Sequence, residues 1–148
     1  MGAGTGSVSV ELALAAPRGH VYAVECDPEA CGLIRQNRER FHACNLTLVE
    51  GRAPAALADL PAPDAVFIGG TKGGMEAVLD EVLGKNPNAR ICISAIALET
   101  LGAAIAALTA RGLTAEVTQI AVSRTKPAGR LHLLMANNPI FLITGERK

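Results

Sequence analysis

The residues with the clearest chemical meaning are three glycines at alternate positions, Gly2, Gly4 and Gly6. A glycine turn that leads into a helix presents backbone N–H groups and a helix N-terminus to a ligand, because no Cβ blocks its approach. Roughly 20 residues later Glu25 ends a short apolar run over 20–24, the separation typical of a carboxylate that binds ribose hydroxyls. The pattern therefore predicts a site for a nucleoside-containing cofactor.

Taken alone, the glycines are equally compatible with a mobile amino-terminal tail. The residues that follow favour the ligand-binding interpretation, because the spacing of Val8, Leu12 and Ala15 predicts a helix over 6–16. Loop, helix, strand 20–25 and acid together form a βαβ unit without its first strand. We therefore expect either that the chain is shortened at its amino terminus or that another chain fills the gap in the sheet.

Strand and helix patterns alternate along the rest of the chain. Apolar runs predict strands over 46–49, 64–68 and 90–94, and helical spacing with capping residues predicts helices over 28–41, 54–59, 75–83 and 97–110. Two long strands, 115–122 and 131–143, joined by a loop over 123–130, end the chain. This order predicts one α/β domain, a doubly wound and mostly parallel sheet that ends in an antiparallel pair. Its ligand site would lie at the carboxyl ends of the strands.

The helix over 28–41 has the most complete local signals. Asp27 is placed to cap its start, and a proline at position 28 suits the first helical position. Leu33, Ile34, Phe41 and Ala30 are expected to form its buried face.

Composition restricts the class of partner. The chain has 148 residues, 49% of them hydrophobic, which is enough for a globular core. Its formal net charge is zero, whereas a nucleic-acid binder normally carries a basic excess. Aromatic residues make up 3% and Trp is absent, which argues against base stacking. We expect no nucleic-acid partner.

Cysteine spacing and hydropathy bear on metals and membranes. The four cysteines form no CxxC pair and no Cys/His ligand spacing, so no metal site is expected. We interpret them as reduced and mostly packed thiols. No apolar run is long enough to span a bilayer, and we expect a cytoplasmic protein without a membrane partner.

The glycine spacing resembles that of Rossmann-like S-adenosylmethionine-dependent methyltransferases, whereas NAD-binding domains space their glycines as G-x-G-x-x-G. Further motifs narrow the resemblance, and in chain order they occupy residues 2–8, 21–25, 45–51, 67–70, 98–101 and 135–139. Together they resemble the decarboxylating precorrin-6Y C15-methyltransferase family of cobalamin biosynthesis, over nearly the whole chain. The last two motifs are the most specific.

The resemblance implies methyl transfer from S-adenosylmethionine to C-15 of a precorrin, with loss of CO2 from the C-12 acetate. It also implies a tetrapyrrole substrate and a homo-oligomer, a tetramer in the family. Since the methyl donor is already a strong electrophile, positioning and water exclusion would carry most of the catalysis. Two alternatives stay open: a catalytically impaired fragment or assembly subunit, and a methyltransferase that acts on RNA or protein.

The resemblance also implies which residues would bind the cofactor. The loop of Gly2, Ala3, Gly4, Thr5 and Gly6 would cradle its amino-acid portion. Glu25 would bind the ribose, or else simply end a strand. Arg52 and Ala53 fall where the family contacts adenine. The family usually has Asp at the position of Arg52, and a guanidinium, which only donates, cannot replace that acceptor.

Substrate residues are implied in two segments. The first is a glycine cluster after the strand over 64–68, comprising Gly69, Gly70, Thr71, Gly73 and Gly74, in which Lys72 looks inserted; a flexible loop is the alternative. The second segment carries Arg124, Lys126 and Arg130, which would meet substrate carboxylates unless they belong to a solvated turn. His132 is a weak candidate for proton movement during decarboxylation, and a structural strand histidine is the alternative.

Overall fold

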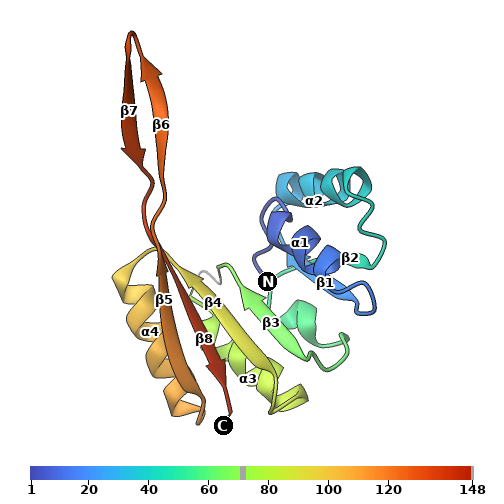
Figure 1. Cartoon of the computed structure of the whole chain (residues 1–148). Coiled ribbons are helices and arrows are strands. Elements are labelled where there is room, and N and C mark those ends of the chain that lie inside the picture. Colours follow the sequence, from blue (N-terminus) through green and yellow to red (C-terminus); the bar gives the residue numbers. More distant parts are fainter. Residues whose placement is uncertain (71–72, 148) are drawn as a thin grey trace. The chain divides into compact units, whose positions relative to one another are not determined.

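The computed structural model describes residues 1–70 and 73–147. Thr71 and Lys72, to which the sequence assigned a place in the substrate loop, lie outside the described residues. The chain divides into two compact units, residues Met1–Ala89 and Arg90–Lys148 (Figure 1). Helices and strands alternate through the first unit and as far as β5 of the second, and the chain then continues with strands alone.

The first unit contains the predicted glycine loop and acid. In chain order its elements are α1 (Ser7–Ala15), β1 (Val21–Glu25), α2 (Pro28–Arg40), β2 (Leu46–Glu50), the short 3-10 helix η1 (Ala55–Leu57), β3 (Ala65–Ile68) and α3 (Met75–Lys85). Strands β1 and β2 run parallel, with Val21 opposite Leu46 and Glu25 opposite Glu50. The loops that leave the two strands therefore start side by side at one edge.

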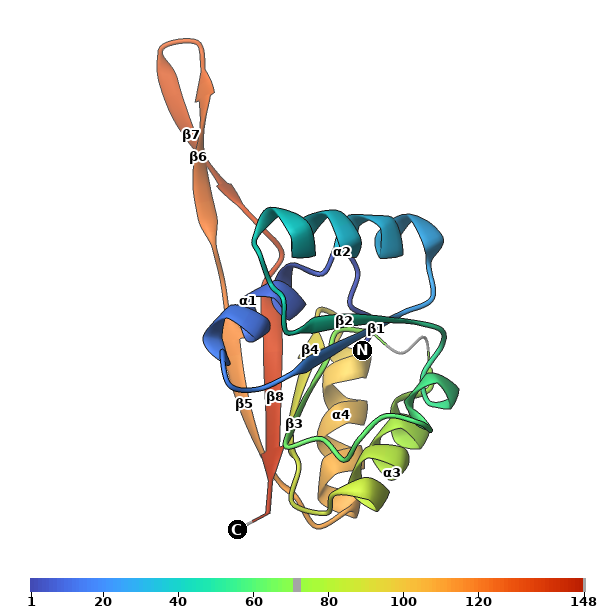
Figure 2. The same ribbon diagram turned by 90° about the vertical axis from the view of Figure 1, so that its right-hand side faces the viewer.

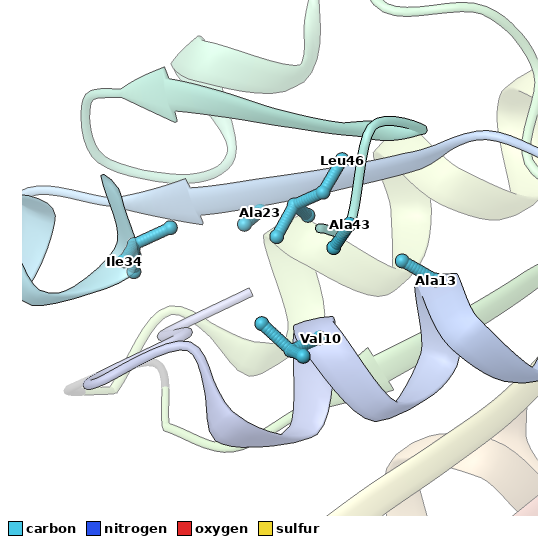
Figure 3. Packing of buried hydrophobic residues seen from close by; sticks show 6 residues of the cluster. All are labelled: Val10, Ala13, Ala23, Ile34, Ala43 and Leu46. Carbon is cyan, nitrogen blue, oxygen red and sulfur yellow. The ribbon is translucent and has the colours of Figure 1, made fainter. Parts of the chain in front are cut away.

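A small apolar core holds α1 and α2 against the β1–β2 pair (Figures 2 and 3). Its members are Val10, Ala13, Ala23, Ile34, Ala43 and Leu46. The side chain of Asp27 caps α2 by accepting a hydrogen bond from the Ala30 amide at 3.0 Å, as predicted.

The predicted buried face of α2 is partly wrong. Ile34 is fully buried and Cys31 nearly so, but Leu33 is 37% exposed and Phe41 48% exposed. Leu33 lies about 100° around the helix from Ile34, and Phe41 lies beyond the last helical residue. The buried stripe is thus narrower than the apolar pattern.

The second unit is built around β8 (Ile140–Glu146), which lies between β4 (Arg90–Ala95) and β5 (Thr114–Ile120) and is antiparallel to both. Helix α4 (Leu98–Ala110) packs on these strands through Ala104, Ala107 and Leu108. A Cβ on Gly145 of β8 would come within 2.8 Å of the Leu108 side chain, so glycine there lets the helix approach closely.

The carboxyl-terminal prediction needs one correction. The expected loop over 123–130 is mostly strand β6 (Ser123–Ala128), and the expected single strand 131–143 is two strands, β7 (Leu131–Ala136) and β8. Strands β6 and β7 form an antiparallel hairpin that extends from the ends of β5 and β8 (Figures 1 and 2). The predicted bend at residues 137–139 is confirmed as the break between β7 and β8. Strand β6 consists mostly of charged and polar residues, so it has no apolar run from which a strand would be predicted.

The four cysteines are free thiols, and the expectation that most are packed holds only in part. Cys31 is buried and Cys92 half-buried, but Cys26 and Cys44 are exposed. Burial raises the pKa of the Cys31 and Cys92 thiols, which keeps both protonated at neutral pH.

Candidate functional site

The Glu25 carboxylate is held in one position at the end of β1. Its Oε2 accepts a hydrogen bond from the Gly4 amide at 2.8 Å, and its Oε1 accepts from the amides of Cys26 at 2.8 Å and Asp27 at 3.0 Å. Only 9% of the residue is exposed. A carboxylate offers about four lone-pair sites, so Oε2 keeps capacity for a further donor such as a ligand hydroxyl.

The surroundings of Glu25 favour its ionised form. Burial alone raises the pKa of a carboxyl group, but hydrogen bonds from the amides of Asp27, Gly4 and Cys26 outweigh this effect. The pKa of Glu25 is therefore lowered from its ordinary value of 4.5. At neutral pH the group is an acceptor with fixed geometry.

The two glycine clusters meet backbone to backbone. A Cβ on Gly2 would lie 2.4 Å from the carbonyl oxygen of Gly70, and the Gly69 amide donates to the Met1 carbonyl at 3.0 Å. Gly2 also has a φ of 60°, in the left-handed region that favours glycine. The predicted need for glycine is thus real, and part of its cause is the approach of the second cluster.

Neighbouring groups fix the remainder of the amino-terminal loop. The Ala3 amide donates to the Val24 carbonyl at 3.2 Å, and the Asn37 side chain donates to the Thr5 carbonyl at 2.9 Å. Gly6 is the N-cap of α1, and a Cβ there would lie 2.8 Å from Ile34. Ala3, Gly4, Thr5 and Gly6 therefore shape the loop, although none of them lines the pocket described next. Asn37 was missed in the sequence, because no motif connects it with a carbonyl 32 residues away.

A pocket of about 190 Å³ lies where these loops converge. Six of its lining residues are predicted site residues: Gly2, Glu25, Arg52 and Ala53 were expected to bind the cofactor, and Gly69 and Gly70 the substrate. The sequence patterns missed Val24, Cys26 and Gly51, which are chain neighbours of predicted residues. Small-molecule sites usually measure about 300–1,000 Å³, so this pocket accounts for part of a nucleoside cofactor rather than for all of it.

The loop after β2 completes the pocket through Arg52 and Ala53. It begins with the Gly51 amide donating to the Glu25 carbonyl at 2.8 Å. A Cβ on Gly51 would lie 2.9 Å from the Ala56 Cβ, so glycine allows the loop to fold back on itself. The arrangement ties this loop to the residue that carries the carboxylate.

The other predicted substrate residues that the structure describes lie outside the pocket lining. Gly73 and Gly74 precede α3, with Gly74 at its N-cap, and Thr71 is outside the described residues. Arg124 and Lys126 lie in β6 of the second unit, Arg130 follows that strand, and His132 lies in β7.

Register separates the hairpin residues into two faces. Arg124 pairs with Met135 and Lys126 with Leu133, so these four side chains share one face. His132 pairs with Pro127, one position out of phase, and so lies on the opposite face.

The described residues offer neither a metal centre nor a membrane span. Within 1–70 and 73–147, no three His, Cys, Asp or Glu side chains gather as ligands for an ion. In the same part of the chain, none of the helices combines the length and apolar character needed to cross a bilayer.

The pocket can hold a ligand with hydroxyl groups. It combines a fixed carboxylate with glycine backbone that leaves room for a close approach. Its polar groups are suited to binding and orientation of such a ligand.

Comparisons with known proteins identify the family of the chain over nearly its whole length. Residues 1–147 match the family model described as precorrin methyltransferase domain. A curated relative, the cobalt-precorrin-6B C(15)-methyltransferase (decarboxylating) of Salmonella typhimurium, is 37% identical over 150 residues, which cover 100% of this chain and 77% of the relative. The crystal structure of precorrin-6y C5,15-methyltransferase from Geobacter metallireducens matches with a TM-score of 0.93 and 38% identity, covering 99% of this chain and 78% of that one.

A more distant match supports the fold alone. The S-adenosylmethionine-dependent O-methyltransferase of Thermotoga maritima shares 17% identity at a TM-score of 0.77, covering 100% of this chain and 58% of that one. The predicted Rossmann-like methyltransferase fold is confirmed by these structural matches.

Proposed function

Because the chain belongs to the precorrin methyltransferase domain family, we propose that it methylates C-15 of a precorrin and removes the C-12 acetate carboxyl as CO2, in cobalamin biosynthesis. Membership confirms the resemblance found in the sequence, and the enzyme class is methyltransferase. The observation that carries the proposal for this chain is the Glu25 carboxylate, fixed by three amides beside the glycine loop.

The residues of the pocket fit S-adenosylmethionine as cofactor. Oε2 of Glu25 has acceptor capacity for one ribose hydroxyl, and the contact of Gly2 with Gly70 would not survive a Cβ. When bound, this cofactor supplies an electrophilic methyl group on a sulfonium. Glu25 would orient the sugar, and the loop from Gly2 to Gly6 would contact the amino-acid portion.

Arg52 and Ala53 would contact the adenine. The Arg52 guanidinium only donates hydrogen bonds, so an acceptor for the adenine amino group would have to come from the backbone of this loop. The planar guanidinium can instead stack on a ring. Both contacts require that the loop after β2 hold its position.

Substrate would be recognised by the second glycine cluster and by the β6–β7 hairpin. On one face of the hairpin, Arg124 and Lys126 lie opposite Met135 and Leu133. Cations beside exposed apolar side chains suit a macrocycle that carries carboxylates, and Arg130 adds a third charge. His132, on the other face, remains a candidate for proton movement only if substrate reaches that side.

We also propose a homo-oligomer, a tetramer by family resemblance, in which the hairpin contacts a second copy. Every residue of β6 and β7 is exposed, with Leu134 at 71%, and a two-stranded ribbon is marginally stable alone. The face that carries Leu134 also holds Ser123, Thr125, Pro127, His132 and Ala136, with no Lys, Arg, Asp or Glu. Light scattering of Leu134→Glu should then report smaller particles than the unchanged protein, and an unchanged mass would contradict the proposal.

Turnover tests the reaction itself. The protein is incubated with S-adenosylmethionine and the precorrin substrate, and mass spectrometry follows product and S-adenosylhomocysteine. We expect a product that has gained one methyl group and lost one CO2, and little product from Glu25→Ala. Binding of the methyl donor without turnover would favour the assembly-subunit alternative. Methylation of RNA or protein in place of the precorrin would reject the substrate.

A further inference from the structure

Lys85, the last residue of α3, makes contacts that the proposed function does not use. Its ammonium donates to three backbone carbonyls of one loop, those of Leu57 at 2.5 Å, Ala58 at 2.6 Å and Leu60 at 2.7 Å. An ammonium has three N–H donors, so each donor has its own carbonyl. Glu81, one helical turn earlier, lies 3.6 Å away.

Lys85 supplies N–H donors to carbonyls at and beyond the C-terminal end of η1, and the Leu57 carbonyl also accepts from the Leu60 amide at 3.1 Å. A short helix such as η1 leaves carbonyls at its C-terminal end without helical partners, and that end carries partial negative charge. The Lys85 ammonium lies at this end and neutralises it. The next residue, Asn86, donates its side-chain amide to the Pro63 carbonyl at 2.8 Å, so the end of α3 holds two parts of one loop.

Hydrogen bonds connect the loop segment that Lys85 binds with the pocket. The Leu57 amide donates to the Pro54 carbonyl at 2.8 Å, and the Ala56 amide donates to the Arg52 carbonyl at 3.0 Å. At the other end, the Gly51 amide is tied to the Glu25 carbonyl. The segment from Gly51 to Leu60 is therefore one bonded unit, fixed by Glu25 at its start and by Lys85 at its end.

We infer that Lys85 is a positioning residue for the nucleobase of the cofactor, acting on Arg52 and Ala53 through the loop without touching the ligand. This inference rests on the proposed function, because it assigns the loop to the adenine. Leu57, only 7% exposed, keeps an apolar anchor when the ammonium is removed. Loss of Lys85 should therefore loosen the loop without detaching it.

The test compares Lys85→Met with the matched control Glu81→Gln, which removes the ion pair and leaves the three carbonyl contacts. Calorimetry measures the affinity for S-adenosylhomocysteine and for S-ribosylhomocysteine, which has no base. We expect Lys85→Met to lose about tenfold in affinity for the adenine ligand, equivalent to about 1.4 kcal/mol, and much less for the ligand without a base. Glu81→Gln should change neither value.

A second readout needs no ligand. Amide hydrogen exchange at Ala56, Leu57 and Leu60 should accelerate in Lys85→Met but not in Glu81→Gln. Lys85→Arg keeps the charge but offers a planar fork, so it should give an intermediate result and replace Lys85→Met if that variant does not fold.

The outcomes separate this inference from the proposed function. Equal losses for both ligands, or unchanged exchange and affinity, would overturn the role of Lys85 while leaving the cofactor in place. If the unchanged protein binds neither ligand, the cofactor assignment is rejected and the role in adenine binding is rejected with it.

Discussion

The pocket loops and the β6–β7 hairpin both carry predicted binding residues, but they are held in different ways. Groups from elsewhere in the chain fix the pocket loops. The side chains of Asn37 and Glu25 bind the glycine loop, and the Lys85 side chain and the Glu25 backbone carbonyl bind the loop after β2. The hairpin pairs with itself and exposes every residue of its two strands. The pocket loops are thus organised before a ligand binds, whereas the hairpin gains buried contacts only from a partner or substrate.

Removing the Glu25 carboxylate is the strongest way to break the pocket. Glu25→Ala deletes the acceptor for the ribose and leaves the amides of Gly4, Cys26 and Asp27 without partners. The lost hydrogen bond to a charged group corresponds to about 10- to 10²-fold in affinity. Calorimetry with S-adenosylhomocysteine measures this, and Glu25→Gln, which keeps one acceptor oxygen, should lose less.

Acid should produce the same loss reversibly. Since the pKa of Glu25 lies below its ordinary value of 4.5, the stability it contributes is present above that value and is lost as pH falls through the lowered pKa. Affinity should therefore be equal at about pH 7 and about pH 5 and fall only in stronger acid. Glu25→Gln should remove this acid-dependent fall, and a decline already visible between pH 7 and pH 5 would contradict the assignment.

The contact between the glycine clusters gives a sharper test with a smaller expected effect. Gly2→Ala puts a methyl group 2.4 Å from the Gly70 oxygen, whereas a Cβ at Gly4 meets nothing within 4 Å. Both glycines have positive φ, 60° and 55°, so both changes carry the same backbone cost. Gly2→Ala should therefore cost about tenfold more affinity than Gly4→Ala. Equal effects would show that the approach of Gly70 does not matter.

Hairpin charges should have the smallest effects, and only on substrate. Arg124→Gln and Lys126→Gln each remove one exposed cation, for which about a two- to fivefold rise in KM for the precorrin is expected. The affinity for S-adenosylhomocysteine should not change. A changed cofactor affinity with an unchanged KM would contradict the assignment of these residues to substrate binding.

Sequence patterns predicted the features of the site that depend on residues close together in the chain. The glycine loop, Glu25 and the Asp27 cap are local signals, and six predicted residues line the pocket. Patterns missed Asn37 and Lys85, whose partners are carbonyls 25 to 32 residues away, because any residue type can supply a carbonyl.

Burial was predicted less well than secondary structure. The stripe of Val8 and Leu12 correctly indicated a helix, but both residues are exposed and α1 packs through Val10 and Ala13 instead. Because apolar residues occur all around α1, their periodicity predicts a helix but does not determine which face is buried. Strand β6 was not predicted because polar side chains are as compatible with a ribbon exposed on both faces as with a loop.

A structure of the protein with bound S-adenosylhomocysteine tests the central claim most directly. The account predicts a ribose hydroxyl within hydrogen-bond distance of Oε2 of Glu25, the amino-acid portion along residues 2–6 and the adenine beside Arg52 and Ala53. A ligand bound elsewhere, or one that leaves Glu25 without a ribose contact, would contradict it.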